Sequence, residues 1–136
     1  MKLLPTLGKI LVLTPLLSTQ TNALDWPEFR GPERNGVSAA KGVPLKWSEE
    51  GHDNLRWSTE IPGKGWSSPT LHAGRLYLTS AIETDGAITL NALCIEASSG
   101  KLVWNVPVFT PDPSDATRMH KKNTAASPTA IVDGSA

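Results

Sequence analysis

Hydrophobic and polar positions alternate in short runs along the chain, and a period of two predicts β-strands. Four runs carry the pattern: LRWSTEI at 55–61, RLYLTS at 75–80, AITLNALCIE at 87–96 and LVWNV at 102–106. Turn-forming dipeptides bound them: Ala73-Gly74, Asp85-Gly86 and Ser99-Gly100. From residue 24 onward no stretch keeps a helical period. The pattern predicts an all-β fold, with four short antiparallel strands joined by tight hairpins into a meander.

The composition of two runs predicts which faces are buried. In residues 55–61 the apolar side chains and Thr59 share one face, and Arg56, Ser58 and Glu60 take the other. Residues 87–96 are apolar on both faces, as expected of a strand buried between layers. The only cysteine, Cys94, lies in this run and is interpreted as a small core residue. A single cysteine excludes a disulfide framework within the chain and a cysteine-rich zinc site.

Two short motifs recur along the chain. LRW at 55–57 returns as LVW at 102–104, and SSPT at 67–70 returns as ASPT at 126–129. The second link between the motifs is longer, which indicates an inserted loop. A repeat of about 40–50 residues with four strands is typical of a β-propeller blade. Trp104 would then present its indole to the next blade; the alternative is an ordinary core tryptophan of a β-sandwich.

The first 23 residues have the pattern of a secretory signal peptide. Lys2 and Lys9 supply positive charge, ILVLTPLL at 10–17 is a short apolar core, and Ala23 ends a small-residue cleavage site. The alternatives are a membrane anchor or a buried N-terminal helix. The apolar run is shorter than the ~20 residues of a membrane span, and Pro15 interrupts it. We therefore expect export to the periplasm or cell envelope, with no transmembrane anchor after cleavage.

The charge of the chain bears on its partners. With 13 basic and 13 acidic residues, the formal net charge is zero. The chain therefore has no basic footprint for nucleic acid, and we expect no nucleic-acid partner.

One motif carries a family resemblance. A-x-x-G-K-x-x-W, formed by Ala97, Gly100, Lys101 and Trp104, resembles the tryptophan-docking repeat of PQQ-like (pyrrolo-quinoline quinone repeat) β-propellers. Four further stretches are similar to exported bacterial proteins of this family: DWPEFRGPERNGVS at 25–38, PLKWSE at 44–49, GKGWSSP at 63–69 and HKKNTAASPT at 120–129. The chain departs from the docking motif at Ser99, where threonine is usual, and at Glu96, where aspartate is usual.

The resemblance implies that the chain is a fragment of a propeller and that it divides into five segments. We expect a signal peptide at 1–23, an N-terminal extension at 24–54, the strands of the first blade at 55–106, an inserted loop at 107–125 and the first strand of the next blade at 126–136. The strand that follows HAG in the first repeat has no counterpart after IVDGSA. The expected fold is thus an incomplete PQQ-like propeller, one blade and the start of a second. Its partners are then its own missing blades or other proteins. Trp57 and Trp104, with Ala97 and Gly100, are the expected docking residues.

The family also suggests an enzyme. Quinoprotein dehydrogenases of this resemblance hold PQQ over a calcium ion, often with adjacent cysteines against the cofactor. Cys94 has no neighbouring cysteine, and no carboxylates show calcium-loop spacing. We therefore interpret the chain as a non-catalytic platform that binds proteins, with no catalytic or metal residues. The alternative is the N-terminal part of a PQQ-dependent dehydrogenase. PQQ is considered as a cofactor only because of the family resemblance. Sensor domains attached to kinases are a third class, but no kinase signature is present.

A few polar residues remain as candidates. His120, Lys122 and Asn123 lie on the inserted loop, where a ligand or partner could dock at the mouth of a propeller channel. The alternative is a solvated basic loop. His72, next to a hairpin turn, is interpreted as solvated. Arg30 and Arg34 are expected to anchor the N-terminal extension by hydrogen bonds, and the alternative is that they face a partner.

Overall fold

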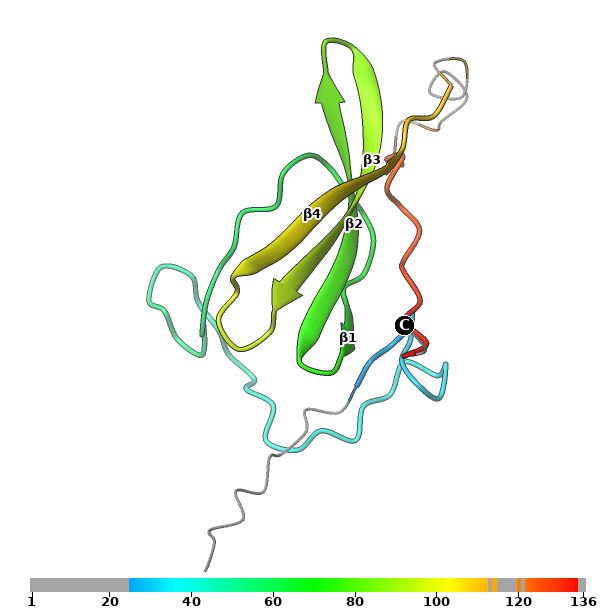
Figure 1. Ribbon diagram of the computed structural model, residues 1–136. Helices are drawn as coiled ribbons and strands as arrows, with labels where there is room; N and C mark the ends of the chain where they lie inside the picture. The colour runs from blue at the N-terminus through cyan, green and yellow to red at the C-terminus, as the bar shows by residue number, and fades with distance from the viewer. Residues whose placement is uncertain (1–24, 113, 115–119, 121, 135–136) are drawn as a thin grey trace, which may run out of the picture.

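The protein is described by a computed structural model that covers residues 25–112, 114, 120 and 122–134, and the expected signal peptide lies outside these residues. Four antiparallel strands form one open sheet in the order β1-β2-β3-β4 (Figure 1). They are β1 (Thr70–His72), β2 (Arg75–Thr84), β3 (Ala87–Glu96) and β4 (Leu102–Phe109). The predicted all-β fold with four antiparallel strands is confirmed, and three of the four predicted strands are in the sheet.

Two tight turns join the first three strands. Asp85 and Gly86 connect β2 to β3 with φ of 51° and 80°, and Ala73 and Gly74 connect β1 to β2 with φ of 48° and 76°. Positive φ at both central positions is the geometry of a type I′ hairpin, whose twist matches that of the flanking strands. These turns set the register between the strands.

Residues 55–61, expected to be the first strand, are not in the sheet, and β1 takes that place. The predicted alternation of faces is nevertheless correct, because Leu55, Trp57, Thr59 and Ile61 are half-buried and the residues between them are exposed. A period of two indicates an extended chain with one buried face. Such a chain can be extended without forming backbone hydrogen bonds to a neighbouring strand. Further along, Lys64 pairs with Ala81 of β2 in an isolated bridge.

Strand β4 is longer than expected and forms one edge of the sheet. It extends to Phe109, so three residues of the expected loop at 107–125 belong to the strand. Its pairing with β3 contains two register shifts, at Leu90/Asn91 and at Cys94/Ile95. Several of its apolar side chains are exposed: Val103, Val106, Val108 and Phe109. The outer edge of β4 has no neighbouring strand among the described residues.

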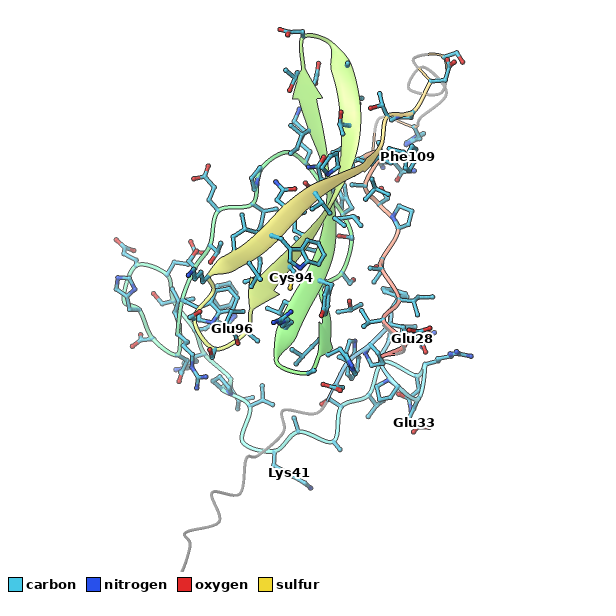
Figure 2. The ribbon with its side chains drawn as sticks, in the orientation of Figure 1. Glu28, Glu33, Lys41, Cys94, Glu96 and Phe109 are labelled. Carbon is cyan, nitrogen blue, oxygen red and sulfur yellow. The ribbon has the colours of Figure 1, made fainter. Side chains whose placement is uncertain are left out.

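The core is centred on β3. Leu93 and Cys94 are fully buried and Ile95 is 3% exposed, which confirms the expected buried strand for its second half. Toward the β2–β3 turn the strand is half-buried or exposed. The register aligns Tyr77, Cys94 and Trp104 across β2, β3 and β4 on one face, and Cys94 lies in the middle of the sheet in Figure 2.

Segments from both ends of the described chain meet beside β1 (Figure 1). Trp26 exchanges two backbone hydrogen bonds with Leu71, at 2.7 and 2.9 Å, and the Val132 N–H donates to the Pro27 carbonyl at 2.9 Å. Residues 126–134, where a strand was expected, make individual hydrogen bonds of this kind and no ladder. The last two residues of that expected strand lie outside the described part.

Within the described residues, no helix has the length and apolar character that crossing a membrane requires.

Candidate functional site

The side chain of Trp57 is seated on the turn that follows β3. Its indole Nε1–H donates to the Ala97 carbonyl at 2.9 Å, although the two residues are 40 positions apart in sequence. Two residues on, the Thr59 hydroxyl donates to the Gly100 carbonyl. The structure therefore brings together Trp57, Ala97 and Gly100, three of the four expected docking residues.

Gly100 forms the floor of this contact. It is buried, its φ is 72°, and its N–H donates to the Glu96 carbonyl at 2.8 Å. A Cβ atom at this position would lie 2.5 Å from both Cδ2 and Cε3 of the Trp57 ring. Only glycine allows both the left-handed backbone and the close approach of the indole.

Trp104, the fourth expected docking residue, belongs to a different contact. It is half-buried on β4, directly opposite Cys94. Its ring centroid lies 6.1 Å from that of Tyr77, with the rings tilted by 51°. Trp104 occupies the position in LVW that Trp57 occupies in LRW, so the two copies of the motif have different surroundings here.

The candidate loop residues His120, Lys122 and Asn123 are exposed and form a local turn. The Lys122 N–H donates to His120 Nδ1 at 3.2 Å, and the Asn123 N–H donates to the His120 carbonyl at 2.8 Å. Asn123 also lines a hollow of ≈450 Å³, together with residues of the β2–β3 hairpin and Lys64. The sequence did not indicate this proximity to Lys64.

A second polar pair was missed by the sequence. His72 Nδ1 lies 2.9 Å from Asp25 Oδ2, and Asp25 Oδ1 accepts the Ala73 N–H at 3.0 Å. The interpretation of His72 as merely solvated is therefore wrong. A histidine and an aspartate this far apart in sequence give no spacing signal, so only the fold reveals the pair.

His72 also faces a hollow of ≈530 Å³ at the end of β1. Arg75 and Tyr77 of β2 line it with His72, and so do residues 131–134 near the end of the described chain. The volume is within the range of small-molecule sites.

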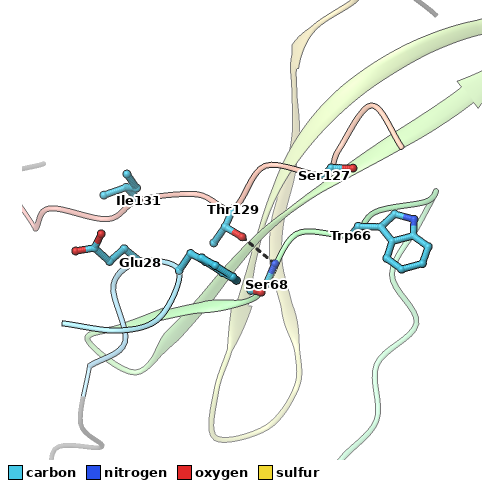
Figure 3. Close-up of a pocket in the computed structure, with 7 residues that line it drawn as sticks. Glu28, Trp66, Ser68, Ser127, Thr129 and Ile131 are labelled. Atoms are coloured by element: carbon cyan, nitrogen blue, oxygen red, sulfur yellow. Dashed lines mark hydrogen bonds between the residues drawn. The ribbon is translucent and has the colours of Figure 1, made fainter. Parts of the chain in front are cut away.

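The two copies of the S-P-T motif meet at a third hollow, of ≈350 Å³ (Figure 3). The Ser68 N–H from the first copy donates to Thr129 Oγ1 of the second at 3.0 Å. Glu28 lies on the rim and pairs with Arg34 at 3.0 Å, an ion pair within the N-terminal extension itself. The repeat detected in sequence thus corresponds to two segments lying side by side.

Cys94 is not placed to react. Burial raises the pKa of its thiol above the ordinary value of 9.0, and the Arg75 charge and a hydrogen bond with Tyr77 lower it by less. A buried thiol that stays protonated is a poor nucleophile. The described residues also contain no group of three His, Cys, Asp or Glu side chains that could hold a metal ion.

Comparison of the chain with protein-family models, curated proteins and solved structures gave no match.

Proposed function

We propose that the chain is the N-terminal part of an exported PQQ-like β-propeller that serves as a non-catalytic binding platform for proteins in the cell envelope. The observation that supports this most directly is the Trp57 indole seated on Gly100 and bonded to the Ala97 carbonyl. The remaining support comes from the motif repeat and from the open edge of the sheet.

The docking contact joins two successive copies of one motif. Trp57 ends the first copy, and the turn that receives it, at 97–100, leads directly into the second copy at 102–104. An arrangement in which each tryptophan is received by the turn of the next unit can continue from unit to unit. Trp104 is then the docking residue for a further unit.

Strand β4 supplies the surface for that further unit or for another protein. An edge strand presents unpaired N–H and C=O groups that favour pairing with an additional strand. Here the edge carries exposed apolar side chains as well, with Val106 46% and Val108 61% exposed. A backbone edge combined with apolar side chains suits a polypeptide partner better than a small molecule.

A catalytic role receives less support from the described residues. Cys94 is single and buried, and no cluster of potential metal ligands accompanies it. The platform therefore remains the function that the described residues support best.

The platform can be tested by site-specific photo-crosslinking in the exporting cell. A benzophenone amino acid is placed at Val106 on the β4 edge, and in a matched variant at Glu83 on the exposed end of β2. We expect an adduct from position 106 to a polypeptide segment that carries a further docking turn, identified by mass spectrometry. The variant at position 83 should give none.

Two results would contradict the proposal. One is equal crosslinking from both positions. The other is quinone- and calcium-dependent dye reduction by the purified protein, which would instead support the dehydrogenase. Intact-mass measurement and N-terminal sequencing of the exported protein would test the cleavage after Ala23.

A further inference from the structure

We infer that the hollow at the end of β1 binds a small monocarboxylate with an apolar body, whose carboxylate lies between the His72 imidazole and the Arg75 guanidinium. This inference does not depend on the proposed platform role, because it concerns the opposite edge of the sheet from β4.

The hairpin turn places the two recognition residues together. His72 and Arg75 are directly opposite each other in the register of β1 and β2, and such pairs have Cβ atoms about 4.5–5.5 Å apart on the same face. Two cationic or hydrogen-bonding side chains at that separation can contact the two oxygens of one carboxylate. Both line the ≈530 Å³ hollow.

Asp25 fixes the orientation of the imidazole. Its Oδ2 lies 2.9 Å from His72 Nδ1, and its Oδ1 accepts a hydrogen bond from the Ala73 N–H at 3.0 Å. With Nδ1 engaged, the ring nitrogen left for a ligand is Nε2, which donates a hydrogen bond when both ring nitrogens carry a proton. Side chains held in this way lose little conformational entropy when a ligand binds.

Arg75 is available to a ligand. Within the described part of the chain it forms no hydrogen bond or ion pair with another side chain. Its opposite residue on β3 is Glu96, whose carboxylate accepts the Ser98 hydroxyl instead. A guanidinium without an anionic partner is well suited to bind a carboxylate with two parallel hydrogen bonds.

The remaining wall indicates the kind of carboxylate. The Tyr77 ring and residues Ile131 and Val132 supply apolar surface, which favours a ligand with an apolar body. The Asp25 carboxylate lies behind the imidazole. Its negative charge disfavours a ligand that carries a second negative charge, as inorganic phosphate largely does at neutral pH.

The test is a titration of the purified protein with sodium benzoate, followed by isothermal calorimetry and by NMR chemical shifts. We expect saturable binding that weakens about tenfold or more in Arg75→Gln, the effect of losing a charge-assisted hydrogen bond. His72→Gln should weaken it by a smaller factor. The matched control is Arg56→Gln, which removes an exposed arginine from residues 55–61 and should leave binding unchanged.

Ligand controls complete the design. Benzamide, which has the same ring without the charge, and inorganic phosphate should both bind at least tenfold more weakly than benzoate. Circular dichroism verifies that each variant is folded. Absence of saturable benzoate binding, equal weakening by Arg56→Gln, or equal or tighter binding of benzamide or phosphate would overturn the inference.

Discussion

The indole of Trp57 lies on the backbone of Gly100, where a side chain as small as a methyl group would overlap the ring. This contact attaches an extended segment to a sheet whose ladder it does not join. The attachment consists of one ring face, the Nε1–H bond to Ala97 and the Thr59 hydroxyl bond. Side-chain contacts with this turn therefore help to fix the position of residues 55–61.

Removal of the indole should destabilise the protein measurably. We expect Trp57→Ala to lower the free energy of unfolding by about 2–3 kcal/mol, below the ~3–5 kcal/mol of a fully buried aromatic because Trp57 is half-buried. Trp57→Phe keeps a ring on Gly100 but loses the bond to Ala97, at about 1 kcal/mol. Urea unfolding followed by circular dichroism measures both.

Trp47→Ala is the matched control, because Trp47 is 71% exposed and its loss should change stability by no more than about 0.5 kcal/mol. Equal effects of the substitutions at positions 47 and 57 would contradict the docking contact.

Gly100→Ala tests the floor of the same contact. The added methyl must both enter the left-handed region, at about 1–2 kcal/mol, and displace the Trp57 ring, at about 1–3 kcal/mol. Gly86→Ala has a similar φ of 80° but no atom within 4 Å of the added Cβ, so it carries the backbone cost alone. Thermal or urea unfolding should show a clearly larger loss at position 100. If the two losses are the same, the indole does not press on this glycine.

The sheet was largely predictable because its signals are local. The alternation in β2, β3 and β4 and the Gly-containing turns between them lie within a few residues of each other. Asp85-Gly86 is a pair that favours a type I′ turn. Residues 55–61 have the same alternation but no ladder. Burial of one face governs the alternation, whereas a ladder also requires a free strand edge, which the sequence does not report.

The polar pair Asp25–His72 was not predictable. Neither residue has a partner at a recognisable spacing, and the pair exists because the N-terminal segment bridges to Leu71 of β1. The hollow beside it requires residues 131–134 as a further wall. Contacts between segments so far apart in sequence leave no trace in hydrophobic periodicity.

Stability should fall at alkaline pH through Cys94. Because burial raises the pKa of the folded thiol above 9.0, the unfolded chain loses this proton first. The folded state then binds more protons than the unfolded state, so the free energy of unfolding falls as pH rises above about 9. Below that pH the group contributes no pH dependence. Cys94→Ala should show a shallower decline between pH 8 and pH 10 in urea unfolding, and parallel curves for the two proteins would contradict the burial effect.

The hydrogen bond between buried Asn91 and half-buried Asn105 offers a double-mutant test. The Nδ2 of Asn91, which is 8% exposed, donates to Asn105 Oδ1 at 2.7 Å. Asn105→Leu should cost about 1–3 kcal/mol, because it leaves a buried donor without its partner. The double variant Asn91→Leu/Asn105→Leu should cost less than this single substitution. If the losses in the free energy of unfolding of the two single variants simply add in the double variant, the two side chains do not stabilise each other through this bond.

The hydrogen bonds of Trp26 and Pro27 also have a consequence for the order of folding. These residues come first in the described chain, yet they bond to Leu71 and to Val132, the latter near its end. Contacts of such high contact order form slowly, because a long loop must close before they are made. The β2–β3 hairpin can form from neighbouring residues, and the Trp26 bonds can form once β1 exists. The bond between Pro27 and Val132 must wait until nearly the whole described chain has been synthesised. Formation of the contact between Pro27 and Val132 beside β1 is therefore expected to be the last step of folding.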